Sequence, residues 1–136
     1  MADLIFDSFK EFMGDNTIDM DGHVFKIALL SNSYTPDQTD VYFSEVQAAE
    51  ISGTGYTAGG VALTGVTWTK NGGTTTFDAE NPEWANATFT TYYAVIYDDT
   101  ASNDPLVALF DFGGPKSPSG VPFRVIFDAL GIITLS

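Results

Sequence analysis

The chain has 136 residues, of which 44% are hydrophobic and 14% aromatic, so it can bury the core of a single domain and is too apolar to be disordered. Its formal charge is −13, with 18 acidic residues against 5 Lys and Arg, which argues against nucleic acid and anionic membranes as partners because both attract clustered cations. Cysteine is absent, which excludes disulfides and thiolate metal sites.

The first predicted element is one short helix within residues 1–14. Apolar residues recur there at spacings of three and four, Asp3 is placed to cap the first turn, and Gly14 is placed to end the helix. Because so short a helix depends on packing, its aromatic face docks either on the core of its own chain or, as an assembly arm, on a neighbouring subunit. The candidate subunit or capsid contacts are Leu4, Ile5, Phe9 and Phe12.

The same N-terminal stretch lacks the basic region and the continuous apolar region of a signal peptide. No apolar run in the chain reaches the length of a membrane span. We therefore expect synthesis in a cytoplasm and no membrane partner.

After Asp21-Gly22 the apolar period changes to two, which predicts a strand over residues 23–31 with Phe25, Ile27 and Leu29 on one face. Asn71-Gly72-Gly73 predicts a tight hairpin. Further strands are predicted over residues 61–70, 74–80, 87–99, 106–112, 121–128 and 132–136.

The segments between these strands are predicted as turns or short extended pieces. Residues 41–46 are expected to be extended or a turn, and residues 81–86 a turn with Trp84 available for burial. The stretch 87–99 is expected to be the longest strand, and its apolar residues are expected to share one face: Phe89, Tyr93, Val95 and Tyr97. Seven or eight short strands behind one helix predict a mainly β domain over residues 1–136, an antiparallel β-sandwich or jelly-roll.

Five glycines between residues 50 and 70 raise the question of a phosphate-binding loop. The gap from Gly55 to Gly60 matches a P-loop, but Val61 and Ala62 stand where Lys and Ser or Thr belong, and a strand follows instead of a helix. These glycines are therefore predicted to adopt positive φ in turns or bulges.

Motifs for catalysis or metal binding are weak throughout. The acidic turn at residues 17–22 resembles part of a calcium loop but lacks its first and last ligands, and His23 is the only histidine. Asp78 and Glu80 stand two apart on a predicted strand, an arrangement that arises by chance in so acidic a chain. We predict no enzymatic activity, no metal and no cofactor.

Eight aromatic residues could form either a stacking platform for sugars or part of the core and the subunit contacts, and the latter is favoured on a small domain. They are Tyr34, Tyr42, Tyr56, Trp68, Trp84, Tyr92, Tyr93 and Tyr97.

Several stretches together resemble a widespread group of small virion proteins of tailed bacteriophages, and the likeness extends over nearly the whole chain. They are SYTPD (33–37), E-[IV]-x-G-x-GYTAGG (50–60), WAN (84–86), AVIYDD (94–99) and PL-x-x-x-x-DFG (105–113). Two features depart from the group: an Arg often stands in place of Tyr92 or Tyr93, and a Trp commonly ends the stretch that here reads VPFRVIF.

The resemblance implies a structural subunit of the virus particle. Within that class it favours a head decoration or cement protein that binds the outside of the major capsid shell, assembled as a homo-oligomer, with a trimer expected. Two alternatives remain open: a subunit of the tail, neck or fibre, and a carbohydrate-binding adhesion module.

Overall fold

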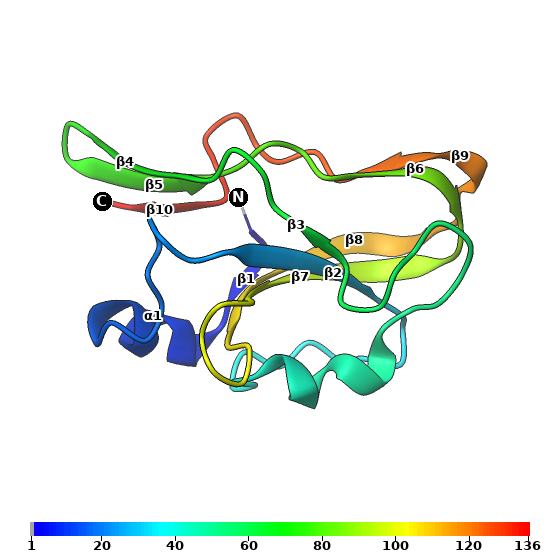
Figure 1. Ribbon diagram of the computed structural model, residues 1–136, viewed down its shortest axis with the longest axis horizontal. Helices are drawn as coiled ribbons and strands as arrows, with labels where there is room; N and C mark the ends of the chain where they lie inside the picture. The colour runs from blue at the N-terminus through cyan, green and yellow to red at the C-terminus, as the bar shows by residue number, and fades with distance from the viewer. Residues whose placement is uncertain (1) are drawn as a thin grey trace.

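A computed structural model describes residues 2–136, and in it antiparallel sheets stack in layers with one α-helix (Figure 1). The elements are β1 (Leu4–Ile5), α1 (Asp7–Gly14), β2 (Phe25–Leu30), the 3-10 helices η1 (Phe43–Glu45) and η2 (Gln47–Ala49), β3 (Val61–Ala62), β4 (Thr67–Asn71), β5 (Thr74–Asp78), β6 (Glu83–Thr88), β7 (Thr91–Asp98), β8 (Leu106–Lys116), β9 (Ser119–Arg124) and β10 (Ile133–Leu135). The predicted mainly β, antiparallel domain with one helix is confirmed, with ten strands in the described chain instead of seven or eight.

A five-stranded sheet of order β1-β8-β7-β2-β3 forms the middle layer. One face packs against a three-stranded sheet, β10-β5-β4, and a two-stranded ribbon, β6-β9, while η1 and η2 cover the other face (Figure 1). Because both faces of its central strands are buried, these strands read as continuous apolar runs, as in IALL (27–30) and LVALF (106–110).

The two faces of the five-stranded sheet contribute side chains to two separate hydrophobic clusters. On β2, Phe25, Ile27 and Leu29 point into the cluster between the sheets, as predicted, and Ala28 and Leu30 point into the cluster under the 3-10 helices. Across the layers, the rings of Phe25 and Phe77 meet edge to face with centroids 5.1 Å apart.

The prediction of one helix over residues 1–14 is wrong in its first part. Leu4 and Ile5 form β1, which pairs with Leu109 and Ala108 of β8, and the helix begins only at Asp7. Asp3 does not cap the helix, because its carboxylate accepts a hydrogen bond of 2.8 Å from the backbone N–H of Asp111.

The four candidate contact residues of this segment have different environments. Phe9 is 1% exposed and belongs to the cluster between the sheets, so it is not available to a second subunit. Phe12 is half-buried and stacks on Tyr42 with ring centroids 6.2 Å apart, while Leu4 and Ile5 lie half-buried on β1. A contact role for these last three residues stays a prediction.

Several predicted strand boundaries are corrected. The strand expected over residues 61–70 is divided into β3 and β4 by a turn in which Gly65 has a φ of +61°. Residues 81–86 are largely strand β6 instead of a turn, although Trp84 is buried as expected. Residues 41–46 contain η1. The longest strand is β8, which runs on through Gly113 and Gly114 to Lys116.

The long stretch 87–99 is also divided, since residues 87 and 88 end β6 and β7 begins only at Thr91. Tyr93, Val95 and Tyr97 share the face toward the 3-10 helices, as predicted, but Phe89 lies in the corner before β7 and packs between the sheets. The hairpin at Asn71-Gly72-Gly73 is confirmed, with Asn71 opposite Thr74.

Phe9→Ala should destabilise the folded chain by about 3–5 kcal/mol, because it empties a site in the core. Phe12→Ala is the matched control at a half-buried position of the same helix and should cost clearly less. Urea unfolding followed by circular dichroism measures both free energies of unfolding. Equal and small losses for the two variants would show that Phe9 does not belong to the core of its own chain.

Candidate functional site

The glycine-rich segment serves the fold, and its predicted positive φ angles are confirmed. Gly53, Gly55, Gly59, Gly60 and Gly65 have φ angles of +153°, +85°, +92°, +79° and +61°. A Cβ on Gly60 would lie 1.8 Å from the carbonyl oxygen of Ile27, so only glycine lets the segment pass this close to β2.

The polar groups of this segment bond to one another. The carboxylate of Glu50 accepts hydrogen bonds from the hydroxyl of Tyr56 (2.6 Å) and the N–H of Gly59 (2.7 Å), and the N–H of Gly60 donates to the carbonyl of Thr57 (2.9 Å). The hydroxyl of Tyr97 donates to the carbonyl of Gly59 (2.6 Å). The amides of Gly59 and Gly60 are therefore already in use within the segment.

Burial raises the pKa of both tyrosines in this network. For Tyr56 the Glu50 carboxylate, which accepts a hydrogen bond from the hydroxyl, raises the pKa further, and for Tyr97 the nearby carboxylates of Asp99 and Asp104 do so. Both hydroxyls therefore remain protonated donors across the physiological pH range and keep the segment on the sheet.

The acidic turn ahead of β2 is held by its own side chains. Asp19 Oδ1 accepts hydrogen bonds from the N–H groups of Asp21 (3.0 Å) and Gly22 (3.1 Å), which is an Asx turn. Within residues 2–136, no group of three or more His, Cys, Asp or Glu side chains is arranged to hold a metal ion.

His23 has a partner that the sequence did not indicate. Its Nδ1 lies 2.5 Å from Oδ2 of Asp98, a fully buried carboxylate at the end of β7. Oδ1 of Asp98 accepts hydrogen bonds from the backbone N–H groups of Thr100 (2.9 Å) and Ala101 (3.1 Å). The pair fastens the loop after β7 to the start of β2, and the lone histidine gave no signal of it because its partner is 75 residues away.

The other predicted candidates do not combine into a reaction centre. Asp78 ends β5, whereas Glu80 lies beyond it and accepts a hydrogen bond of 2.6 Å from Thr64 Oγ1, so the two are not a pair on one strand. Among the eight aromatic residues, Tyr34, Trp84 and Tyr97 are buried, so they cannot belong to an exposed stacking platform. The remaining five are half-buried.

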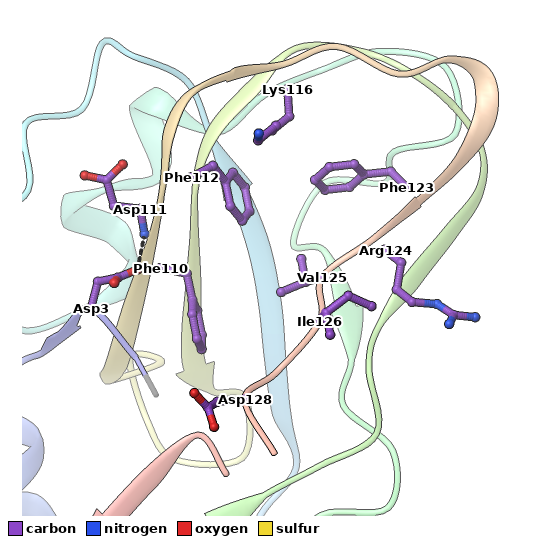
Figure 2. Close-up of a pocket in the computed structure, with 10 residues that line it drawn as sticks. All are labelled: Asp3, Phe110, Asp111, Phe112, Lys116, Phe123, Arg124, Val125, Ile126 and Asp128. Atoms are coloured by element: carbon purple, nitrogen blue, oxygen red, sulfur yellow. Dashed lines mark hydrogen bonds between the residues drawn. The ribbon is translucent and has the colours of Figure 1, made fainter. Parts of the chain in front are cut away.

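A cleft of about 460 Å³ lies between β8, β9 and the segment that follows β9 (Figure 2). We call it the β8–β9 cleft. Its apolar lining is Phe110, Phe112, Phe123, Val125 and Ile126, and its charged lining is Asp3, Asp111, Lys116, Arg124 and Asp128.

The cleft exists because the layers are not closed on this side. β1 pairs with β8 only at Leu109 and Ala108, so the rest of β8 has no strand beside it there, and β9 pairs only with β6. Val121 lies opposite the buried Ala87, and although this places it on the inner side of the ribbon, it remains 50% exposed.

The free edge of β8 is protected against addition of another strand. The N–H of Asp111 donates to Asp3 (2.8 Å), and the N–H of Gly113 donates to the side chain of Asp111 (2.8 Å). Pro122 removes one donor from β9. Edge donors that are already satisfied do not offer a template for strand pairing, so a partner of this cleft would bind through side chains.

The charged side chains of the cleft differ in whether they already form an ion pair or a hydrogen bond within the chain. Arg124 forms an ion pair of 2.9 Å with Glu83, and Asp3 and Asp111 accept backbone hydrogen bonds. Lys116 has no carboxylate within 4.0 Å in the described part of the chain. The cleft thus combines an apolar floor with three carboxylates, one paired cation and one cation, Lys116, that has no carboxylate partner among residues 2–136.

Gly60→Ala should abolish or severely weaken folding, by roughly 4 kcal/mol or more, because its Cβ would collide with backbone atoms. Gly72→Ala is the matched control: its φ is +62°, but a Cβ there meets nothing within 4 Å. It should cost only about 1–2 kcal/mol for the left-handed conformation. Equal losses in urea unfolding would contradict the close approach of the glycine segment to β2.

Alkaline pH should unfold the protein as its buried tyrosines ionise. Burial raises the pKa of Tyr34, Tyr56 and Tyr97 above the unfolded value of about 10, so these groups do not change stability below that pH and remove stability as the pH rises above it. Absorbance at 295 nm and near-UV circular dichroism should then change together. Ionisation of all six tyrosines near pH 10 in a chain that stays folded would contradict this expectation.

In residues 2–136 no helix has both the length and the apolar character needed to cross a membrane. Searches with the whole chain find no matching protein-family model, no matching curated protein and no matching solved structure.

Proposed function

We propose that this chain is a structural subunit of a tailed-bacteriophage particle and that it decorates the outside of the major capsid shell. The proposal rests on the ordered stretches that resemble small virion proteins, and on what their residues do in the fold. In this proposal the chain is made in the host cytoplasm and becomes part of the virion.

The observation that carries the proposal is that the most specific of these stretches consists of residues that shape the chain. In the stretch 50–60, Glu50, Tyr56 and Gly59 bond to one another, and Gly60 passes against the carbonyl of Ile27. The likeness to the virion proteins is thus concentrated in groups whose hydrogen-bonding capacity is used within the domain. Such a pattern supports inheritance of a shape and a surface more than inheritance of a reaction centre.

Three of the other stretches also contain residues that serve the fold. Trp84 of WAN packs in the core and stacks near Tyr56 with ring centroids 6.3 Å apart, although its buried Nε1 has no hydrogen-bond partner within residues 2–136. Asp98 of AVIYDD is the buried partner of His23. Asp111 of the stretch 105–113 accepts a hydrogen bond from the N–H of Gly113 at the free edge of β8.

The charge of the chain suits the outside of a shell. A formal charge of −13 keeps an exposed face hydrated and makes it repel other anionic surfaces. The expected trimer rests on the resemblance: closed rings are natural assemblies for subunits placed at the local symmetry points of a shell.

Shells assembled without this chain should bind the purified protein and melt at a higher temperature with it. A ligand that binds only the assembled shell stabilises it by about 2.7 kcal/mol at a free concentration of 100 times Kd. Cosedimentation measures binding, and calorimetry of the shells measures the melting temperature. Shells of an unrelated phage are the control.

Absence of binding to the cognate shell would refute the proposal. Binding to isolated tails alone would favour the tail, neck or fibre alternative. A glycan-array signal that is lost on changing one half-buried Tyr or Trp, with no shell binding, would favour the adhesion module.

A further inference from the structure

We propose that Asn71 is a site of spontaneous chemical modification, at which the folded chain loses ammonia and residue 71 becomes aspartate or isoaspartate. Asn71 precedes Gly72 at the tip of the β4–β5 hairpin, where it pairs with Thr74. The only co-reactant is water, so this inference goes beyond the virion role and does not rest on it.

The reaction joins two groups that are adjacent in the chain. The backbone nitrogen of Gly72 attacks Cγ of Asn71 and closes a cyclic succinimide, while the side-chain amide leaves as ammonia and takes the proton of the Gly72 N–H. Water then opens the ring. Attack at Cγ gives aspartate, whereas attack at the main-chain carbonyl carbon of residue 71 gives isoaspartate, whose backbone continues through Cβ. Either product adds one carboxylate to a chain of formal charge −13.

The attacking nitrogen is free in this fold. Within residues 2–136, the N–H of Gly72 donates no hydrogen bond. Gly72 has no Cβ to obstruct the attack. A Cβ added at Gly72 or at Gly73 would meet nothing within 4 Å, and in Figure 1 the turn projects at the end of the layer formed by β4, β5 and β10. No packed neighbour therefore restrains the backbone at the reacting pair.

The side chain under attack is free as well. Asn71 is exposed, and in the described part of the chain its amide has no hydrogen-bond partner. Gly72 and Gly73 are also exposed, so water reaches the succinimide to open it. Both reacting groups and the co-reactant thus meet at the tip of one hairpin.

The residues after the other asparagines are arranged differently, and none of them is glycine. The N–H groups of Thr17, Ser33 and Asp104 already donate hydrogen bonds of 2.9, 3.3 and 3.3 Å. Pro82 has no N–H, and Ala87 is fully buried in β6. The five asparagines that these residues follow are Asn16, Asn32, Asn103, Asn81 and Asn86.

The pair Asp21-Gly22 offers a comparison within the same chain, because an aspartate before glycine forms the same succinimide with loss of water. Here the N–H of Gly22 donates to Oδ1 of Asp19 (3.1 Å), and a Cβ on Gly22 would lie 2.6 Å from Oδ2 of Asp19. The fold thus holds this nitrogen in an Asx turn. Of the two pairs that the sequence offers, the structure leaves only Asn71-Gly72 ready to react.

Isoaspartate at position 71 would loosen the tip of the hairpin without unfolding the domain. Its additional backbone atom displaces the pair of residue 71 with Thr74, whereas the pair of Trp68 with Phe77 lies further from the turn. Exposed tips of this kind tolerate such changes because little packs on them.

Incubation of the full chain at mildly alkaline pH, in water enriched in heavy oxygen, tests the proposal. Each opened succinimide takes up an oxygen from the water, so mass spectrometry of peptides should find the label at residue 71. Electron-transfer fragmentation separates aspartate from isoaspartate, and circular dichroism confirms that the chain is folded.

Gly72→Ala should slow this conversion by about tenfold or more, because a Cβ at position 72 obstructs the attacking nitrogen. Gly73→Ala is the matched control: it leaves the reacting pair intact, its Cβ also meets nothing within 4 Å, and it should keep the wild-type rate. In urea, Asp21 should also take up the label, because unfolding releases Gly22 from Asp19.

The proposal fails if residue 71 of the folded chain takes up no label. It also fails if Gly73→Ala slows the conversion as much as Gly72→Ala, or if Asp21 reacts as fast in the folded chain as in urea. Since no shell is present, these outcomes are separate from the result of the shell-binding experiment.

Discussion

The carboxylate of Glu50 determines how the glycine segment lies on the five-stranded sheet. It accepts hydrogen bonds from the hydroxyl of Tyr56 and the N–H of Gly59. The hydroxyl of Tyr97 on β7 donates a hydrogen bond to the carbonyl of the same glycine. With these bonds in place, Gly60 can pass against the carbonyl of Ile27. The pairing of β3 with β2, and the covering of the sheet edge beside it, depend on this arrangement.

Burial of the five-stranded sheet on both faces explains why its central strands could be predicted from the sequence. A strand such as β2 needs apolar residues in both clusters, and its strict alternation placed Phe25, Ile27 and Leu29 together correctly. The hairpin at Gly72 was predictable because few residues other than glycine tolerate its φ of +62°.

Other parts of the fold depend on distant partners and were missed for that reason. Leu4 and Ile5 continue the apolar spacing of α1, and only pairing with β8 makes them a strand. In β6 a shift of register between Trp84 and Ala87 breaks the alternation of apolar residues that identifies a strand. The turn-forming pair Asn81-Pro82 therefore led to the prediction of a turn. Phe89 lies at the corner before β7, where the chain changes layers and the period of two no longer applies.

The candidate site was less predictable than the fold. The positive φ angles of the glycine segment were predicted correctly, because glycine is the residue that turns and bulges with such angles favour. The β8–β9 cleft, in contrast, arises because β1 pairs with only two residues of β8, and no local sequence pattern indicates where that pairing ends.

Cryo-electron microscopy of the intact virion tests the structural role most directly. The account predicts density for this domain in many copies on the outer surface of the head, with its sheets recognisable and its acidic surface toward solvent. Purified particles that contain no copy of the chain would contradict it.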